Sequence, residues 1–599
     1  MRRDTALMLL AALMLPAVPA YAKPMTFTVN LTQALGVPAT GSPATGSGTV
    51  VLDPTANTLG VHLTFGGLTS NTIMAHIHCC LTFPFATGVA AVANVGVATT
   101  VPAFPGFPIG VTSGTYDHVL DLTSLASYNS AFVTLQGGTV AGAEAALIRG
   151  IVNGETYLNI HTTNFPSGEI RGFLVAAPTP AQLSLLKTIP INGTAASPNT
   201  KLFSFDISFV DPATGLYYLA DRSNAALDVV DTTGAFTGTP DSLFGQIGGA
   251  AFNFGGDTGL NMPSNVAQGP NGVAARSPCI FATDGLSRVV SINSNVSFVT
   301  PMSSVSTGGT HRADELAIDP NDSLLLVINN ADTPPFGTLI SFSATCALTV
   351  KTKIPFTAAN GINATNGAEQ PAWDPLTQRF YVSIPEINGP GGGGPNGAVA
   401  KINPLTGAIE TFYPVNFMQP AGLTLGPNGD LLVGSNTVFD TSGTACKAVV
   451  PAPMGVNTTA PPAPATCTGI AFPQAAICNP NRGCTPANGS LVSVPGVGGG
   501  DEVWYNSGDG NYYVTASNDP VGPVFGVVGS VVNTLSQLVP TLPPVPANGT
   551  ANTATFVHSS GTAHSITASA ANNHVYLALP ANTGYPNCAQ GCTAVFSTQ

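Results

Sequence analysis

The chain has 599 residues, of which 44% are hydrophobic and only 8% are charged, and its formal net charge at pH 7 is -13. An ordinary soluble domain contains about 25% charged residues, so uncharged polar and small residues must cover most of this surface. The 17 lysines and arginines are too few for the basic surface that releases counterions from nucleic acid. The composition therefore argues against a nucleic-acid partner and leaves a protein, a glycan, a small molecule or a cation.

Residues 1–22 have the features of a secretory signal peptide. An arginine pair precedes an apolar run at residues 6–18, and the small residues Ala20 and Ala22 follow it. This pattern predicts cleavage after Ala22. No other apolar run reaches the roughly 18 residues that a membrane span needs. We therefore expect a secreted or periplasmic protein without a membrane span, in a compartment that permits disulfides.

Ten cysteines are distributed in local groups along the chain. None of the groups has the ligand spacing of a zinc site, so structural disulfides are the favoured interpretation, with the pairing left open. The groups are Cys79 with Cys80; Cys279 with Cys346; Cys446, Cys467, Cys478 and Cys484; and Cys588 with Cys592.

Short strands and turns dominate the predicted secondary structure. The 66 glycines and 51 prolines are typical of an all-β protein with many turns. Within residues 23–177, apolar and polar residues alternate at residues 26–31, 48–52 and 59–65, which is the period of half-buried strands. We expect this first domain to be an antiparallel β-sandwich.

The same domain resembles the CHRD family, named from chordin. The resemblance rests on the opening Phe-Thr-Val-Asn-Leu at residues 27–31, the hairpin at residues 51–59, Ala-His-Ile-His at residues 75–78, and the long motif from Gly-Glu-Thr-Tyr to Glu-Ile-Arg-Gly at residues 154–172. It implies an antiparallel β-sandwich and a role in binding.

Three histidines of this domain are candidate metal ligands. In a strand, His76 and His78 point to one face, and His161 shares a face of a second strand with Tyr157 and Asn159. Three converging imidazoles suit copper or zinc. In the alternative interpretation, the histidines hydrogen-bond to each other and to a nearby carboxylate and only fix the sandwich.

Neighbouring polar residues are candidates for the second shell of this site. Glu169 and Arg171 lie on one face of the next predicted strand, where they form an ion pair or orient an imidazole. Cys79 and Cys80, which directly follow the second histidine, add a thiolate ligand or pair with cysteines elsewhere.

Residues 178–599 contain a repeat that predicts a β-propeller. Variants of Asp-Glu-Leu-Ala-Ile-Asp-Pro recur along this region. The shortest distance between successive copies is 50 residues, from 264 to 314, and the longest is 80 residues, from 421 to 501. These spacings suit four-stranded blades with insertions. The copies begin at Asp206, Ser264, Asp314, Glu369, Ala421, Asp501 and His564. This region resembles the exported propellers grouped with gluconolactonases, streptogramin lyases and YVTN surface proteins.

The number of blades follows from the way the ring closes. The third copy contains four strands, at residues 316–318, 324–328, 338–342 and 350–355, whereas the last copy ends one strand short. Residues 183–191 can supply the missing strand and remove an open sheet edge. We predict seven blades, with six or eight as alternatives, and a disulfide-pinned surface insertion at residues 442–488.

The first column of the repeat carries most of the charge in this region. In a propeller the first strand of each blade lines the channel, and this column supplies Asp206, Asp314, Glu369, Asp501 and His564. Crowded carboxylates either take raised pKa values or recruit a cation, and calcium accepts such oxygen ligands. The next column supplies Glu315, Gln370 and Glu502 as a second shell. Alternatively, the acids bond to backbone amides of adjoining loops.

Two functions from different classes fit these features. The first is a secreted two-domain binding protein that presents the sandwich and the propeller to an envelope, matrix or metal partner. The second is a metal-dependent hydrolase or lyase that acts on a lactone or glycan at the channel mouth, where the metal polarises a carbonyl. The sequence contains no Gly-X-Ser-X-Gly nucleophile motif, and it assigns no catalytic residue.

Overall fold

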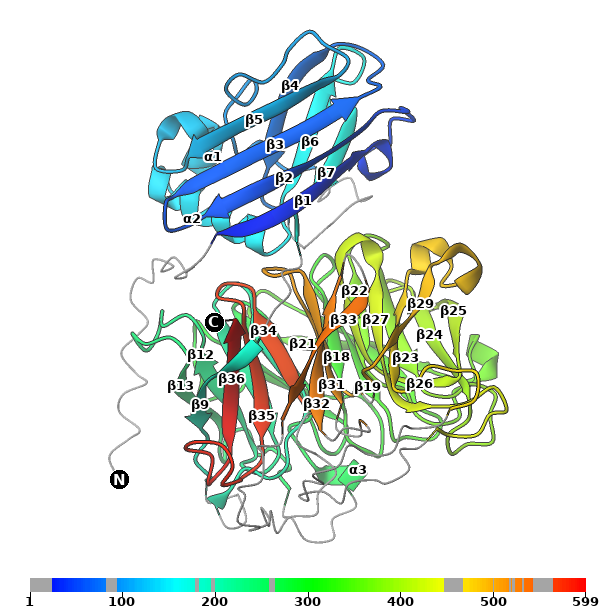
Figure 1. The fold of residues 1–599 in the computed structure, drawn as a ribbon. Coiled ribbons are helices and arrows are strands. Elements are labelled where there is room, and N and C mark those ends of the chain that lie inside the picture. The colour runs from blue at the N-terminus through cyan, green and yellow to red at the C-terminus, as the bar shows by residue number, and fades with distance from the viewer. Residues whose placement is uncertain are drawn as a thin grey trace.

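The structure of the protein, a computed structural model, places an N-terminal domain above a ring of small sheets (Figure 1). It describes residues 24–81, 94–177, 183–194, 200–257, 264–446, 467–498, 500–516, 519, 523–530, 533–541 and 564–598. The predicted signal peptide, at residues 1–22, lies outside the described residues. No helix in the described part of the chain is long and apolar enough to cross a membrane.

The first eight strands form one antiparallel sheet in the order β4-β6-β7-β1-β2-β3-β5, with β8 paired to β1. The alternating residues Phe27, Val29 and Leu31 of β1 are buried in its core. The sheet curls on itself (Figure 1), so one continuous sheet makes the expected antiparallel architecture. Its strands are β1 (Met25–Thr32), β2 (Thr45–Asp53), β3 (Thr58–Gly66), β4 (Thr72–His78), β5 (Gly114–Asp121), β6 (Tyr157–Thr162), β7 (Ile170–Phe173) and β8 (Val175–Ala176).

Two helices, α1 (Ser130–Leu135) and α2 (Val140–Val152), pack on this core. The run that forms α2 is rich in alanine, the best helix former, and its small residues allow close packing against the sheet. Thr139 caps the helix by accepting a hydrogen bond from the Gly142 amide at 3.1 Å. The strand patterns of the sequence did not predict these helices.

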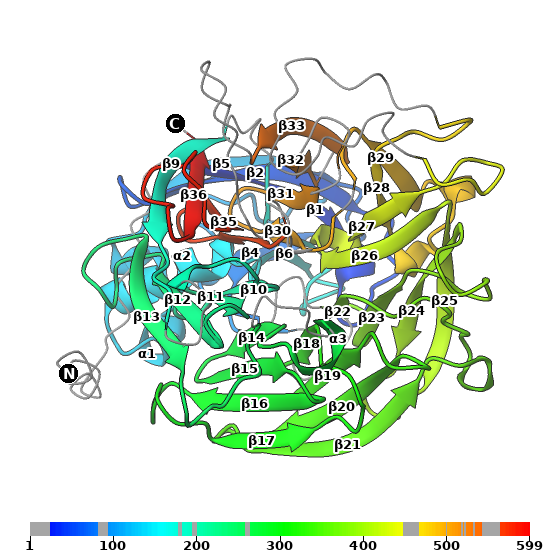
Figure 2. The same cartoon turned by 90° about the horizontal axis from the view of Figure 1, so that it is seen from below.

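Seven four-stranded antiparallel sheets follow within the described residues, and they form the seven-bladed propeller that the repeat predicted. Their first strands lie around the centre of the ring (Figure 2). The blades are β10 (Ser208–Asp211), β11 (Leu216–Asp221), β12 (Ala226–Asp231), β13 (Ser242–Gly248); β14 (Val273–Arg276), β15 (Cys279–Asp284), β16 (Arg288–Asn293), β17 (Ser303–Ser306); β18 (Leu316–Asp319), β19 (Leu324–Asn329), β20 (Phe336–Phe342), β21 (Leu348–Pro355); β22 (Pro371–Asp374), β23 (Arg379–Ile384), β24 (Asn396–Ile402), β25 (Ile409–Asn416); β26 (Met418–Leu425), β27 (Leu431–Val438), β28 (Gln474–Cys478), β29 (Leu491–Pro495); β30 (Val503–Asn506), β31 (Asn511–Ala516), β32 (Val524–Gly529), β33 (Thr534–Pro540); and β34 (Ile566–Ser569), β35 (His574–Leu579), β36 (Cys592–Thr598), β9 (Leu183–Pro190).

The ring closes through the strand that precedes the first blade. β9 pairs antiparallel with β36, from Cys592 opposite Pro190 to Thr598 opposite Leu183. The last blade is therefore built from both ends of the propeller sequence. The pairing gives β36 a neighbour on each side, and it confirms the predicted closure and the count of seven blades.

Two details of the predicted propeller are wrong. The second copy of the repeat does not form a first strand, because Ser264 begins the short helix α3 (Ser264–Ala267) and β14 begins only at Val273. In this blade the Gly-Pro pair precedes the first strand instead of ending it. The predicted surface insertion also contains β28, since the alternating apolar residues Ala475 and Ile477 are buried in blade five. The sequence did not predict this strand because prolines and cysteines surround it.

All ten cysteines are paired. The bonds follow the local groups of the sequence: Cys79–Cys80, Cys279–Cys346, Cys446–Cys467, Cys478–Cys484 and Cys588–Cys592. The adjacent pair corrects the expectation that Cys79 or Cys80 bonds elsewhere or binds a metal as a thiolate.

The N-terminal domain rests on the face of the propeller where the first strands end. Ala570 and Ala571, just after β34, pack against the core of that domain. Tyr505, near the end of β30, packs with Tyr157 and Phe173. The opposite mouth of the channel, where the first strands begin, lies on the far side of the ring (Figure 1).

Replacing Phe596 of β36 by alanine tests the closure of the ring. Phe596 is buried in a cluster with Phe525, and their ring centroids lie 5.1 Å apart. The cavity should lower the free energy of unfolding of the propeller by about 3–5 kcal/mol, as measured by denaturant titration. Val299→Ala, at a site that is 54% exposed, should change it by less than about 0.5 kcal/mol. Equal effects of the two variants would contradict this closure.

Candidate functional site

The three candidate histidines of the N-terminal domain lie on one face of its sheet. His76 and His78 alternate along β4 with Ile77, which points into the core on the opposite face. His161 lies on the neighbouring strand β6, and Asn159 of that strand stands directly opposite His76. The three histidine side chains are buried. The alternation of β4 and β6 therefore gathers three imidazoles, as the sequence predicted.

The geometry of these imidazoles is that of a ligand set. Their ring centroids lie 4.8 to 5.8 Å apart, and one nitrogen from each ring can be chosen so that all three lie within 4.8 Å of one another. His78 Nδ1 lies 2.8 Å from the Val95 carbonyl, and His161 Nδ1 lies 3.0 Å from the Pro166 carbonyl. Because a carbonyl only accepts, both rings carry their proton on Nδ1, and each Nε2 keeps a lone pair.

The free nitrogens of the cluster have no other partner. Nε2 of His78, Nε2 of His161 and both ring nitrogens of His76 are buried and make no hydrogen bond. The alternative interpretation required the histidines to bond to each other or to Glu169, and these nitrogens make no such bonds. A structural role of the histidines therefore leaves four buried polar atoms unexplained.

Burial keeps the three imidazoles neutral at pH 7. It lowers the pKa of His76 to about 4 and that of His78 to about 3, and it also lowers the pKa of His161. Mutual repulsion between the rings acts in the same direction on His76 and His78. Neutral imidazole is the form that binds copper or zinc, so protons do not compete for this site at neutral pH.

The predicted second shell is different in the structure. Glu169 accepts hydrogen bonds from Ser42 Oγ at 2.6 Å, from the Thr69 amide at 2.7 Å and from Thr162 Oγ1 at 2.6 Å, and no imidazole is among these donors. The Arg171 guanidinium lies over the Tyr157 ring, 4.1 Å from its centroid. The Val95 and Pro166 carbonyls fix the rings instead.

At the far mouth of the propeller, the predicted column forms a charge network. His564 bridges two carboxylates, with Nε2 2.8 Å from Asp206 and Nδ1 3.0 Å from Asp501. One oxygen from each acid and a ring nitrogen lie within 4.8 Å of one another. Three of the five column residues therefore meet directly.

Two arginines complete this network. Arg222 pairs with Asp206, and its Nη2 lies 4.0 Å from Asp314 Oδ1. Arg312 Nη2 lies 3.0 Å from Asp314 Oδ2. Neither arginine belongs to the aligned repeat columns. The two guanidinium groups therefore balance carboxylates for which the sequence predicted a calcium ion.

The remaining acids of the two columns take raised pKa values. Burial raises the pKa of Glu369 well above its ordinary value, and the nearby Asp501 and Asp314 raise it further. Burial also raises the pKa of Glu315 well above its ordinary value, and Glu369 adds to this effect. For Glu502, burial raises the pKa to about 8. Protonated glutamates and arginines together limit the negative charge in the channel.

Two residues of the second column join neighbouring blades. Gln370 Oε1 accepts from the Leu423 amide at 2.6 Å. Glu502 accepts from the Ile566 amide at 2.8 Å and from the Ser208 amide at 3.0 Å. Gln370 and Glu502 therefore act as the alternative to cation binding expected: their side chains accept hydrogen bonds from backbone amides. These bonds hold adjacent blades together.

The alignment of the repeat could have found more of this network. Asn271 precedes β14 by two residues, as Asp206 precedes β10, so it takes the place in the column that was assigned to Ser264. Its Oδ1 accepts from Arg222 Nε at 2.8 Å. Arg222 directly follows β11, whose end lies beside the start of β10. Residues after the second strand thus reach the same mouth.

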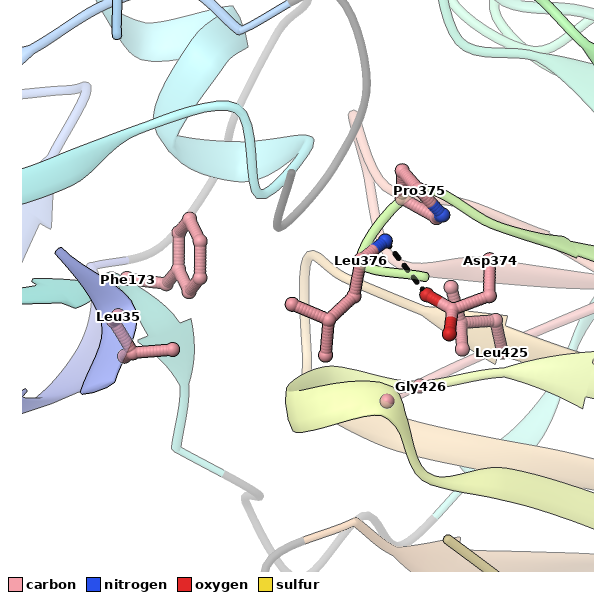
Figure 3. A pocket seen from close by; sticks show the side chains of 8 residues that line it. Leu35, Phe173, Asp374, Pro375, Leu376, Leu425 and Gly426 are labelled. Atoms are coloured by element: carbon pink, nitrogen blue, oxygen red, sulfur yellow. Dashed lines mark hydrogen bonds between the residues drawn. The ribbon is translucent and has the colours of Figure 1, made fainter. Parts of the chain in front are cut away.

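A small pocket lies between the two domains (Figure 3). Leu35 and Phe173 line it from the N-terminal domain, and Leu376 and Leu425 line it from the propeller. Its only charged lining residue, Asp374, accepts from the Leu376 amide at 2.8 Å and so holds a turn. The pocket contains neither of the two clusters described above and has the character of an interdomain packing gap.

Comparison with known families identifies the first domain. Residues 27–174 match the model of the CHRD domain. These residues form a CHRD domain. The match leaves the propeller outside the family, and no curated protein matches the chain. The resemblance of the propeller to the gluconolactonase, streptogramin lyase and YVTN group stays a prediction.

Solved structures match the chain at low similarity. Hydrazine synthase of Kuenenia stuttgartiensis is 12% identical over 68% of this chain and 99% of its own, with a TM-score of 0.42. The WD40 β-propeller domain of Doa1 is 9% identical over 70% of this chain and 98% of its own, with a TM-score of 0.39. The structure of U3-55K is 9% identical over 70% of this chain and 99% of its own, also with a TM-score of 0.39.

Glu502 should make the stability of the propeller depend on pH. Its pKa is about 8 in the folded protein and near 4.5 in the unfolded chain. Its contribution is therefore full below about pH 4.5 and is lost as the pH rises to about 8. Between pH 5 and 8 the free energy of unfolding of the wild type should fall by a few kcal/mol, at about 1.4 kcal/mol per pKa unit. Glu502→Gln mimics the protonated carboxyl, so this fall should be absent in the variant.

The measurement is denaturant unfolding of the wild type and the variant at pH 5, 6.5 and 8. Asp117→Asn, at a carboxylate whose side chain is 82% exposed, serves as the control and should follow the wild type. Parallel pH profiles for the wild type and Glu502→Gln would show that Glu502 does not hold a proton in the folded protein.

Proposed function

We propose that the protein is an exported metal-binding protein whose CHRD domain holds one copper or zinc ion through His76, His78 and His161. The single observation that carries this proposal is the set of buried, neutral and unpartnered imidazole nitrogens on one face of β4 and β6. Each strand contributes through its alternation, so the site is part of the sheet and not of a surface loop.

The energetics of burial support a ligand at this place. A buried polar group without a hydrogen bond costs about 1–3 kcal/mol, and the cluster contains four such nitrogens. Replacing any of these histidines by an apolar residue would remove that cost. A metal ion instead gives the lone pairs a partner, and it suits the ligand type because imidazole nitrogen is a preferred donor for copper and zinc.

The hydrogen bonds of the rings also suit a metal. Histidines that ligate metals usually donate their second N–H to a carbonyl or carboxylate, which fixes the tautomer and orients the ring. Val95 and Pro166 provide such carbonyls for His78 and His161. With these two rings held, the Nε2 lone pairs are available before an ion arrives, which lowers the cost of ordering the site on binding.

The proposal that the protein is exported rests on its disulfides and on its N-terminal sequence. All ten cysteines form disulfides, and disulfides persist in oxidising compartments. The pattern of residues 1–22 is that of a secretory signal peptide. In this proposal the seven-bladed propeller carries the CHRD domain on one face and presents its opposite face to a protein, glycan or small-molecule partner.

The alternative, a calcium-dependent hydrolase or lyase at the channel mouth, has weaker support. Arg222 and Arg312 already pair with Asp206 and Asp314, and His564 lies between Asp206 and Asp501. A divalent cation there would have to displace internal ion pairs. Ser208 and Ser565 donate their hydroxyl groups to Glu502, while both ring nitrogens of His564 lie on carboxylates, so neither serine is paired with that histidine as a base.

Elemental analysis of the purified protein tests the proposal. The wild type, reconstituted with copper or zinc and desalted, should hold about one ion per chain. His76→Ala/His78→Ala should hold none, because one remaining imidazole binds weakly. His62→Ala, which removes an exposed histidine of the same domain, should retain the full content.

The same measurement on Asp501→Ala separates the two candidate sites. The metal content of this variant should equal that of the wild type. A wild type without bound metal and with an unchanged melting temperature in chelator would contradict the proposal. Calcium that is lost in Asp501→Ala, with no loss in the double histidine variant, would favour the channel mouth instead.

A further inference from the structure

One ring of the candidate metal site lacks the support that the other two have. The Val95 carbonyl fixes His78, and the Pro166 carbonyl fixes His161. Neither nitrogen of His76 makes a hydrogen bond. A neutral imidazole that binds a metal through one nitrogen carries a proton on the other. His76 therefore needs an acceptor when the metal is bound.

Asn159 presents an acceptor that has no partner. It stands directly opposite His76 in the pairing of β4 with β6, and it is only 4% exposed. Its Nδ2 donates to the Ser167 carbonyl at 3.3 Å, which sets the orientation of the amide. Its Oδ1 is buried and makes no hydrogen bond. An unpaired donor position and an unpaired acceptor thus belong to directly opposed residues of two paired strands.

Gly168 holds the amide in this place. A Cβ atom at Gly168 would lie 2.2 Å from Nδ2 and 2.3 Å from Oδ1 of Asn159. The amide therefore rests directly against the backbone of Gly168. The φ of Gly168 is +116°, a conformation that side chains other than glycine rarely adopt.

We propose that Asn159 is a positioning residue of the metal site, whose Oδ1 accepts a hydrogen bond from His76 Nδ1–H when His76 Nε2 binds the metal. This inference rests on the proposed function. Directly opposed residues of an antiparallel pair have Cβ atoms about 4.5–5.5 Å apart, and both side chains are short enough to bridge that distance. All three ligands then have the same arrangement, with Nδ1–H on an oxygen and Nε2 on the metal.

The Pro102 carbonyl is the competing acceptor. Its hydrogen-bonding interaction raises the pKa of His76, against the larger effect of burial, although no partner of His76 meets the distance and angle of a full hydrogen bond. Because Pro102 acts through its backbone, substitutions of Asn159 separate the two acceptors. Loss of the Asn159 oxygen matters only if Asn159 is the partner of His76.

Zinc titration of three proteins tests the proposal. Asn159→Leu removes the oxygen at similar size and should weaken zinc binding about 10- to 100-fold, the usual effect of losing such a partner. Asn159→Asp keeps an acceptor and should bind zinc at least as tightly as the wild type. Affinities come from competition with a chromophoric chelator, and the melting temperatures of the metal-free proteins report whether the variants fold.

A second readout reports the hydrogen bond itself. With nitrogen-15-labelled histidine, the zinc-loaded wild type should show a slowly exchanging Nδ1–H for His76, His78 and His161. In Asn159→Leu the His76 signal alone should be lost to exchange with water. Equal zinc affinities of wild type and Asn159→Leu, or a protected His76 Nδ1–H in that variant, would overturn the proposal. The wild-type spectrum also tests it if Asn159→Leu does not fold.

The experiment separates this inference from the proposed function. If the wild type binds no zinc, the metal site itself is refuted. If the wild type binds zinc through the three histidines and Asn159→Leu binds it equally well, only the role of Asn159 is refuted, and the Pro102 carbonyl remains as the acceptor for His76.

Discussion

The antiparallel pairing of β9 with β36 is the contact on which the rest of the propeller depends. It joins strands from the two ends of the propeller sequence, and it gives the seventh blade its fourth, outermost strand. With the ring closed, seven first strands surround one channel, so their starting residues must share one mouth (Figure 2). The opposite face, at the ends of those strands, receives the CHRD domain through Tyr505 and Ala570. Closure therefore sets the position of the channel-mouth cluster and of the face that receives the CHRD domain.

The two clusters differ in how they satisfy buried polar groups. At the channel mouth, Arg222 and Arg312 pair with the carboxylates, and Glu502 bonds to backbone amides of two other blades. That network pairs most of its charges within the chain and holds the ring together, although Asp314 Oδ1, Glu315 Oε2 and Arg312 Nε make no hydrogen bond. In the CHRD domain, both ring nitrogens of His76 and the Nε2 atoms of His78 and His161 make no hydrogen bond. Unpaired buried polar atoms are rare in native proteins. These four nitrogens of the CHRD domain belong to three neutral imidazoles, and one nitrogen of each ring lies within 4.8 Å of the others, with no cationic side chain paired to them among the described residues. This cluster is therefore the one whose chemistry calls for a ligand.

Much of this was predictable from the sequence because it depends on local periodicity. The alternation of β4 and β6 brings the three histidines to one face, and the Asp-Pro repeat counts the blades. Arg222 was missed because the alignment followed only the first strand of each blade, while the end of the second strand reaches the same mouth. The roles of Glu169 and Asn159 depend on which oxygens find donors after the strands pair. No spacing of residues contains that information.

The central claim is that a metal ion binds among the three imidazoles of the CHRD domain. Anomalous diffraction from crystals of the zinc-loaded, full-length protein tests it most directly. The account predicts one strong peak about 2.0–2.1 Å from the Nε2 atoms of His76, His78 and His161, the usual zinc–nitrogen distance. A peak only between Asp206, Asp501 and His564, or no peak at the three histidines, would contradict it.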